Sequence, residues 1–331
     1  MKMWMSILSV LLVAQLGLAA MLNLTGEDYG AFQADEKLLA IDYSAVDGVR
    51  IGDGEHSVVL KKLGGQWLLP EQGDFPADAG AIEQLLDSLA TLEKGWPVAT
   101  THGAAQRFNV ADDAFERKLE LMAVDTVLAE LYVGTSPGFR KVHVRPAGND
   151  EVFSVAFNSW EANADADDWI DKDLLKLDRD AITRVEMPGI VLQRQGDGFE
   201  VVDLAEGETT DAQEVQTLLS SLSGLRIQSL LGSDARPSSP HDEAGFEINV
   251  AVQGGDDLTY RFNKSDADGY YVLKRSDLNH YVEVAEFTVN TLKAATKEAL
   301  VQLSTEATPG DVAGEAGQSD EPVVDAAAMS E

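Results

Sequence analysis

A serine between two glycines comes closest to a catalytic motif in this sequence. Ser136 lies at the centre of Gly134–Gly138, which fits the Gly-x-Ser-x-Gly pattern of a nucleophilic serine. In that pattern a strand enters the turn and a helix leaves it, so that the hydroxyl stands at the helix start. Residues 139–145 instead alternate as a strand does. We therefore expect a plain turn around Ser136, and an exported hydrolase that acts on glycan or peptide through it remains an alternative.

A run of oxygen-bearing side chains between residues 163 and 173 could surround a calcium ion. Alternate carboxylates along a loop are ligands that this hard cation prefers. The central glycine and the closing glutamate of a calcium loop are missing, because Asp168 and Leu174 stand at those places. We predict a solvated acidic linker, with weak calcium binding as the alternative. The run consists of Asn163, Asp165, Asp167, Asp168, Asp171 and Asp173.

Other residues that hold metals or act as nucleophiles are sparse. Cysteine is absent, which excludes disulfides, a thiol nucleophile, a lipid-modified cysteine and cysteine-based metal sites. The histidines stand far apart, without a second histidine or a carboxylate at helical ligand spacing. Paired carboxylates for glycoside hydrolysis stay open, since an acidic chain offers many pairs. We expect no catalytic, cofactor or metal residues and no enzyme activity. The histidines are His56, His102, His143, His241 and His280.

The charge of the chain limits the classes of ligand that it can be expected to bind. Fifty-seven acidic residues against 25 basic ones give a net charge of −32. Such a surface repels nucleic acid and anionic lipid head groups, so neither is an expected ligand. The apolar fraction of 44% is ordinary for a folded protein and is sufficient for a core without disulfides.

The strands and the helix that would position any site are predicted twice in the sequence, about 130 residues apart. Residues 58–67 indicate a strand, a glycine turn and a second strand, and residues 190–199 repeat this at an offset of 132. Asp78 then precedes an apolar helix face, matched at an offset of 133 by Asp211 and a second face. The two faces are Ile82, Leu85, Leu86, Leu89 and Leu92, and Val215, Leu218, Leu219, Leu222 and Leu225.

Later blocks match in the same order, with a slow drift that small loop changes produce. Arg145 corresponds to Arg275 at 130, and Val155 to Val284 at 129. We interpret the whole as a tandem duplication. The strand residues Phe115, Leu119, Leu121 and Val127 correspond to Phe246, Val250, Val252 and Leu258 at an offset of 131.

The predicted fold class is α+β: each copy is a mainly antiparallel sheet with one covering helix, and one N-terminal transmembrane helix precedes both. The first repeat spans residues 38–168 and the second spans 169–303, each large enough for its own core. Residues 304–331 are acidic and contain no lysine, arginine or aromatic residue. This composition predicts a disordered tail.

The N-terminus predicts a membrane anchor over residues 1–26. Residues 3–24 carry no charge and, as a helix, would span roughly 33 Å at about 1.5 Å per residue. Lys2 precedes the segment and acidic residues follow it, which places the N-terminus in the cytoplasm and the bulk in the periplasm. The protein is therefore expected in the inner membrane with a single pass. A cleaved signal peptide is the alternative, and it exports the domains equally.

Between the two copies the chain resembles a known family. Residues 169–178 read W-I-D-K-D-L-L-K-L-D and lead into A-I-T-R-V-E-M at 181–187, which is similar to a linker and strand of domain of unknown function 4340. Residues 67–70, 131–134 and 142–145 resemble further landmarks, so the likeness covers about 46–301. The resemblance implies no established catalytic residues. It implies an auxiliary component of ABC-type transport systems of the kind linked to gliding motility.

The functional hypothesis is a membrane-anchored periplasmic accessory or scaffold protein that binds an envelope partner, an ABC permease or ATPase complex. A periplasmic small-molecule binding protein and the exported hydrolase are the alternatives. Trp169 is predicted to pack as an anchor at the end of the first domain, with Leu174, Leu175 and Leu177 as an apolar ledge for the next strand. Trp169 and Arg145 are the residues we would test.

Overall fold

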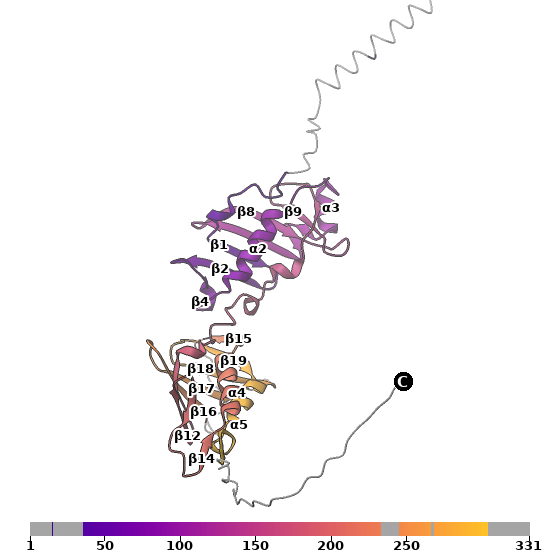
Figure 1. Ribbon diagram of the computed structural model, residues 1–331. Coiled ribbons are helices and arrows are strands. Elements are labelled where there is room, and N and C mark those ends of the chain that lie inside the picture. The colour runs from indigo at the N-terminus through magenta and orange to yellow at the C-terminus, as the bar shows by residue number, and fades with distance from the viewer. Residues whose placement is uncertain (1–14, 16–35, 233–244, 266–267, 304–331) are drawn as a thin grey trace, which may run out of the picture.

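The computed structural model describes residue 15 and residues 36–232, 245–265 and 268–303 (Figure 1). The predicted membrane helix over residues 3–24 lies outside this part except at residue 15, and the predicted tail, 304–331, lies outside it entirely. Within the described ranges, no helix is both long and apolar enough to cross a bilayer.

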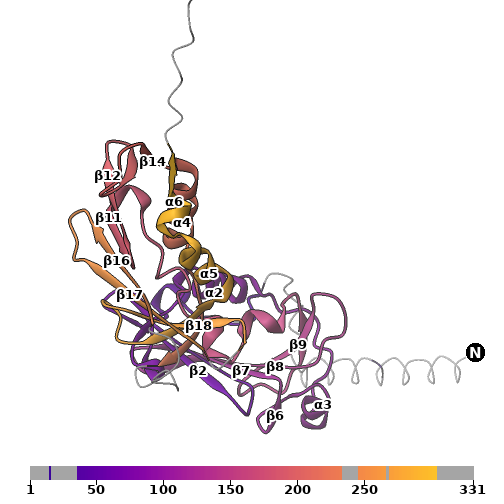
Figure 2. The same cartoon turned by 90° about the horizontal axis from the view of Figure 1, so that it is seen from below.

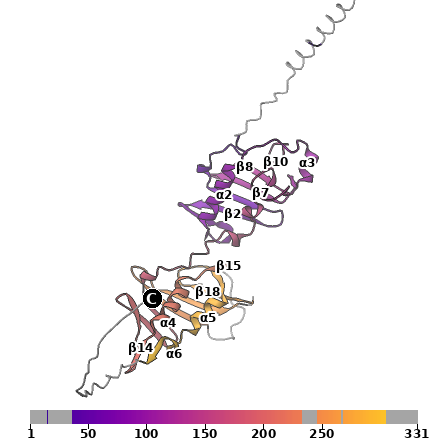
Figure 3. The ribbon, with the colours of Figure 1, turned by 45° about the vertical axis from the view of Figure 1, so that its right-hand side comes forward.

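Two eight-stranded sheets form the framework, and every strand pair in them is antiparallel (Figures 1 and 3). The first sheet has the order β10-β9-β8-β7-β1-β2-β3-β4. Its strands are β1 (Gly48–Gly52), β2 (Ser57–Leu63), β3 (Gln66–Leu69), β4 (Phe75–Pro76), β7 (Arg117–Ala123), β8 (Thr126–Val133), β9 (Val142–Pro146) and β10 (Phe153–Val155).

The second sheet has the order β13-β12-β11-β16-β17-β18-β19-β15. Its strands are β11 (Ile182–Met187), β12 (Ile190–Gln195), β13 (Gly198–Val201), β15 (Ile227–Gly232), β16 (Phe246–Val252), β17 (Leu258–Lys264), β18 (Tyr270–Arg275) and β19 (Tyr281–Ala285). Two short pairs lie outside the sheets: β5 (Val110–Ala111) with β6 (Ala114–Phe115), and β14 (Glu208–Thr210) with β20 (Val301–Leu303).

The two sheets share the order of seven strands. Read from β3 to β10 and from β13 to β19, each strand of one sheet has a counterpart in the other. The first sheet adds β4 beside β3, whereas the second adds β15 beside β19. The coarse prediction of a mixed α and β protein with large antiparallel sheets is confirmed.

The prediction of one covering helix per copy is wrong. We call the part of the chain that carries the first sheet the first unit, and the part that carries the second sheet the second unit. The first unit has α2 (Ala79–Thr91) and α3 (His102–Arg107), and the second has α4 (Ala212–Ser223), α5 (Glu286–Ala294) and α6 (Lys297–Leu300). Helix α4 packs against both α5 and α6. Figure 2 shows these three helices together along one side of the second sheet. The 3-10 helices are η1 (Tyr43–Ala45), η2 (Pro70–Gln72), η3 (Ser159–Ala162), η4 (Ala166–Asp168) and η5 (Arg179–Ala181).

Helices α2 and α4 begin where their sequences predict. The Asp78 carboxylate accepts a hydrogen bond from the backbone N–H of Ala81 at 3.0 Å. The Asp211 carboxylate accepts from the N–H groups of Gln213 and Glu214 at 2.9 and 3.2 Å, which caps the first turn of α4. The buried stripe of each helix lies on its sheet, where a fully buried leucine contributes about 1.5–3 kcal/mol. These stripes are Ile82, Leu85 and Leu89, and Val215, Leu218, Leu219 and Leu222.

Trp169 is buried beside α2, as predicted for an anchor where the first domain ends. It is 4% exposed, and its indole N–H donates to the carbonyl of Asn163 at 2.8 Å. Its own carbonyl accepts from the N–H of Asp78 at 2.8 Å, which ties the linker to the start of α2. Leu175 is fully buried just beyond it. The Trp169 anchor and the apolar ledge are therefore confirmed as packing elements.

The linker is bonded to the second unit as well. The Lys172 carbonyl accepts from the N–H of Ile227 at 3.0 Å, and the Asp167 carboxylate accepts from the N–H of Leu230 at 3.0 Å. Burial raises the pKa of Asp167 above its ordinary value. The His280 ring also meets the Phe75 ring edge-on at 5.1 Å between centroids. The connection between the two units is thus held by side chains and backbone groups from both.

The strand register corrects one predicted correspondence. In the first sheet Arg145 lies opposite Tyr132, and Pro146 lies opposite Leu131. In the second sheet Arg275 lies opposite Tyr260. Tyr132 belongs to a small separate cluster, whereas Tyr260 belongs to the main core. The two arginines therefore face opposite sides of their sheets, and the equivalent of Arg275 is Pro146.

The strand block around Leu121 shifts for the same reason. Val49 pairs with Leu121 in the first sheet, and Val185 pairs with Val250 in the second. Leu121 thus corresponds to Val250 at an offset of 129, and the predicted 131 is wrong by one pleat period. A two-residue shift keeps every side chain on the same face, so the apolar alternation alone did not reveal it.

Candidate functional site

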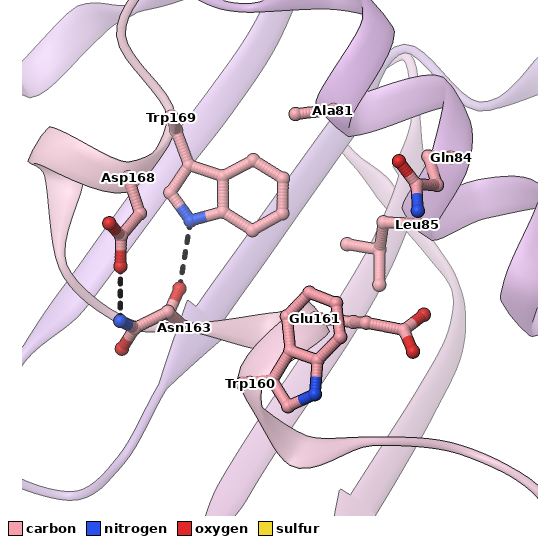
Figure 4. A pocket seen from close by; sticks show the side chains of 8 residues that line it. All are labelled: Ala81, Gln84, Leu85, Trp160, Glu161, Asn163, Asp168 and Trp169. Atoms are coloured by element: carbon pink, nitrogen blue, oxygen red, sulfur yellow. Dashed lines mark hydrogen bonds between the residues drawn. The ribbon is translucent and has the colours of Figure 1, made fainter.

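A groove lies between α2 and the segment that follows β10. Its volume is about 350 Å³, and two tryptophans stand on one side of it (Figure 4). Figure 4 shows three α2 side chains facing them from the opposite wall. The lining residues are Ala81, Gln84, Leu85, Trp160, Glu161, Asn163, Asp168 and Trp169.

The α2 wall is formed by side chains at spacings of three and four. Leu85 is 1% exposed and forms the apolar floor, while Ala81 is half-buried and Gln84 is exposed at the rim. Leu85 belongs to the stripe that α2 buries together with Ile82 and Leu89. Ala81 and Gln84 lie at the edge of this stripe, where the groove opens. The helix therefore presents an apolar floor with a polar edge.

The opposite wall comes from η3 and the start of the linker. Trp160 is 70% exposed, although a tryptophan side chain is among the largest apolar groups. Its neighbour Glu161 accepts a hydrogen bond from the Asn158 amide at 2.6 Å, which orders η3. Trp169 is held by its bond to Asn163, and the Asn163 amide donates to Asp168. The buried Trp169 indole thus forms the wall of the groove, and the exposed Trp160 indole forms its rim.

The groove is acidic. Glu161 and Asp168 line it, and a shallower hollow along the same helix adds Glu83 and Asp87. No lysine or arginine is among the described residues that line either hollow. Carboxylates of one sign around a partly apolar slot favour a cationic ligand. The site can bind through apolar contact and charge, and it brings together no nucleophile with a base.

Ser136 lies in a turn, as predicted. Its hydroxyl donates to the carbonyls of Gly138 and Lys141 at 2.8 and 2.7 Å. The chain continues from the turn into β9. The nearby His143 ring contacts Thr135, whose hydroxyl lies 2.9 Å from Nδ1. The described geometry therefore gives Ser136 no histidine partner.

The acidic run is spread over local turns. Asp165 and Asp171 each accept from a backbone N–H two residues on, at 3.0 Å. Asp173 forms ion pairs with Lys176 and Arg226, each at 2.7 Å, and the Lys176 hydrogen bond lowers its pKa. Within the described ranges, no three histidine or acidic side chains converge as metal ligands. The predicted acidic linker describes this segment.

The histidines stand apart in the structure too. His56 lies 3.6 Å from the carboxylate of Asp53, His102 opens α3, and His280 packs on Phe75. His143 stacks at 4.2 Å on Phe108. His241 lies outside the described residues.

Trp160, Gln84 and Glu161 are the site residues that sequence reasoning missed. Trp160 stands in the segment after β10 that the pattern did not assign to an element. Sequence alone does not distinguish an exposed tryptophan from a core one, because exposure depends on what packs over it. A short Asn-Ser-Trp-Glu turn after a strand was the one available signal.

A family model for "Domain of unknown function (DUF4340)" matches residues 67–247. This range covers more than half of the chain and includes every residue of the groove. The chain belongs to the DUF4340 family. The DUF4340 match begins in β3 and ends in β16, so it takes in parts of both sheets, and it is shorter than the expected 46–301. No curated protein and no solved structure matches this DUF4340 chain.

Proposed function

We propose that the protein is a membrane-anchored accessory protein of the cell envelope that binds a protein partner through the α2 groove. The observation that carries this proposal is the exposed Trp160 at the rim of a slot floored by the buried Leu85. Tryptophan is strongly enriched among the residues that dominate protein interfaces. An exposed indole beside a preformed apolar slot is therefore better suited to binding than to catalysis.

The proposed anchor is the uncharged segment 3–24, with the N-terminus in the cytoplasm and the bulk in the periplasm. The described chain joins the first unit beside the end of α2: the N–H of Leu38 donates to the Leu92 carbonyl, and the N–H of Lys94 donates to the Glu36 carbonyl, each at 2.8 Å. Figure 1 shows this point at the end of the first unit away from the second. Such an arrangement would hold the first unit nearer the bilayer.

The proposed partner is a subunit of an ABC-type transport system. This part rests on the family resemblance drawn from the linker and strand motifs. We also take the two units to be copies of one ancestral unit, which the shared order of seven strands supports.

The test is photo-crosslinking in native membranes from a reactive amino acid placed at position 160 of the full-length chain. The matched control is position 287, because Phe287 in the second unit is 81% exposed. We expect position 160 to crosslink an ABC permease or ATPase subunit, identified by mass spectrometry, and position 287 not to. A clean monomer at position 160 contradicts the proposal.

A second candidate function follows from the size of the groove. A volume of about 350 Å³ falls within the ~300–1,000 Å³ of typical small-molecule sites. A periplasmic small-molecule binder would show ligand-dependent thermal stabilisation of the full-length chain, and Trp160→Ala would remove it. Screening cationic small molecules by thermal shift separates this function from partner binding.

A further inference from the structure

The two units differ in the segment that follows their last equivalent strand. Val155 pairs with Val142 in the first sheet, and Val284 pairs with Tyr271 in the second, which makes Val155 and Val284 equivalent at an offset of 129. After Val284 the chain continues directly into α5. After Val155 it forms the single turn η3.

In the second unit α5 completes the helical layer. It packs against α4, β18 and β19, and its Val289 and Leu292 are fully buried. Five residues separate Val284 from Val289, as five separate Val155 from Trp160. By this spacing Trp160 is the counterpart in sequence of the buried Val289, yet it is 70% exposed.

The sequence explains why the first unit lacks this helix. Residues 158–168 contain Asn158, Ser159, Asn163 and three aspartates, residue types whose side chains bond to nearby backbone and favour turns. The observed Asp165 cap on Asp167 N–H is such a bond. Residues 286–294 have one asparagine, two threonines and no aspartate, and they form α5. The chain thus leaves α2 without the neighbour that α4 has.

We propose that the α2 groove receives an amphipathic helix of the partner protein, which takes the place that α5 occupies in the second unit. This inference rests on the proposed function and specifies the partner's chemistry. The helix would carry apolar side chains three or four residues apart, as Val289 and Leu292 are, to meet Leu85 and Trp160. Its polar face would be rich in lysine or arginine, because Glu161 lines the slot and Glu83 lines the hollow along the same helix.

The charge of the chain disfavours its own segments as occupants. Residues 304–331 have seven acidic residues and no basic one, and residues 25–36 have four acidic residues and no basic one. A second copy carries the same net charge of −32. Each of these would bring like charge to Glu83, Asp87 and Glu161, which opposes binding. A basic helix from a different protein is the occupant that the groove fits.

The test uses three synthetic helical peptides of equal length, titrated calorimetrically into the full-length protein in nonionic detergent. One has the apolar spacing of α5 with lysine at the polar positions, one has glutamate there, and one has the lysine composition with the apolar positions shuffled. We expect only the first to bind. Trp160→Ala should weaken its binding at least about tenfold, while Phe287→Ala should leave it unchanged.

A charge reversal tests the polar half of the proposal. The double change Glu83→Lys and Asp87→Lys should weaken the lysine peptide at least about tenfold and allow the glutamate peptide to bind. Both residues are exposed, so circular dichroism should show an unchanged fold. Equal binding of all three peptides, or binding that Trp160→Ala does not alter, overturns the inference.

The crosslinking experiment separates this inference from the proposed function. If position 160 crosslinks a transport subunit through a strand, a loop or an acidic segment, the helix is wrong and the accessory function stands. If the crosslinked site is a basic amphipathic helix, both stand. If position 160 crosslinks no subunit, the accessory function fails, and the peptide titration alone decides whether the groove prefers a basic helix.

Discussion

Helix α4 lies against α5 over the second sheet, whereas its counterpart α2 faces a groove over the first. The other face shows the reverse difference. In the first sheet Tyr132 and Arg145 are buried under the segment of α3, β5 and β6. Their register equivalents in the second sheet are Arg261, which is exposed, and Lys274, which is half-buried.

The difference shows that two sheets with the same strand order can be covered by different helices and short strands. Among the described residues, the second unit adds α5 and α6 beside α4. The first unit adds α3, β5 and β6 on the opposite face of its sheet. Apolar residues on a strand indicate where a layer is added, as Tyr132 does, and charged ones indicate where none is described. The strand core sets the framework, and the connecting segments decide which parts of each face are covered.

Replacing the Trp169 anchor should have the largest effect. Trp169→Ala removes a buried indole beside α2 at the end of the first unit, and we expect a loss of about 3–5 kcal/mol in the free energy of unfolding. Thermal and urea unfolding of the full-length chain measure it. Trp160→Ala is the matched control, because its indole is mostly exposed. Unchanged melting of Trp169→Ala would remove the anchor role of the linker.

Gly134→Ala should loosen the packing of α3, β5 and β6 on the first sheet. An added Cβ would lie 2.1 Å from the Phe108 carbonyl oxygen and 2.3 Å from that of Asn109, so the backbone after α3 must move. We expect a cost of about 1–3 kcal/mol, with hydrogen exchange rising in residues 102–115 and not in the second unit. Asn263 holds the equivalent place, and Asn263→Ala should leave exchange unaltered. Uniform protection in both variants would contradict the close contact.

Arg145 should matter only to the first unit. It is 6% exposed, donates to the Val110 carbonyl at 2.6 Å, and forms an ion pair with Asp112 at 2.6 Å. Arg145→Met leaves these acceptors without their donor, and we expect about 1–3 kcal/mol of destabilisation by urea unfolding. Lys274→Met, the register equivalent, should change stability by less than about 0.5 kcal/mol. Similar losses in both variants would undo the distinction between the two faces.

The same ion pair predicts a modest pH dependence. The hydrogen bond from Arg145 lowers the pKa of Asp112 below its ordinary value. A lowered folded-state pKa stabilises the fold above the unfolded-state value of about 3.9, and this contribution is lost as pH falls through the folded-state pKa. Asp112→Asn should therefore flatten the acid side of the stability curve between about pH 5 and 2. An identical acid limb in both proteins would show that the pair does not contribute.

The smallest effect on stability is expected at the groove rim. Trp160→Ala should change the free energy of unfolding by less than about 0.5 kcal/mol, because the side chain makes few buried contacts. The same variant should bind the lysine peptide at least about tenfold more weakly. A large stability loss would mean that the indole serves the fold instead of a partner.

Much of the framework was predictable because it depends on short-range patterns. Asp78 and Asp211 begin their helices where a capping residue precedes an apolar stripe, and the glycine turns after β2 and β12 join antiparallel strands as predicted. Helix α5 was missed because its sequence, with Phe287, Thr288 and Val289 in succession, also fits a strand. The register shift at Leu121 was missed because a two-residue slip preserves the alternation.

The sequence by itself determined the charge, the absence of cysteine chemistry, the starts of α2 and α4, the strand alternation and the family. These depend on composition and on neighbours a few residues apart. The tertiary structure alone decided that Trp160 is exposed while Trp169 is buried, and that Arg145 and Arg275 face opposite sides. It also decided that α2 borders a groove where α4 borders a helix. Such features depend on which distant segments pack together, and the energy of that packing is not written in any local stretch of the chain.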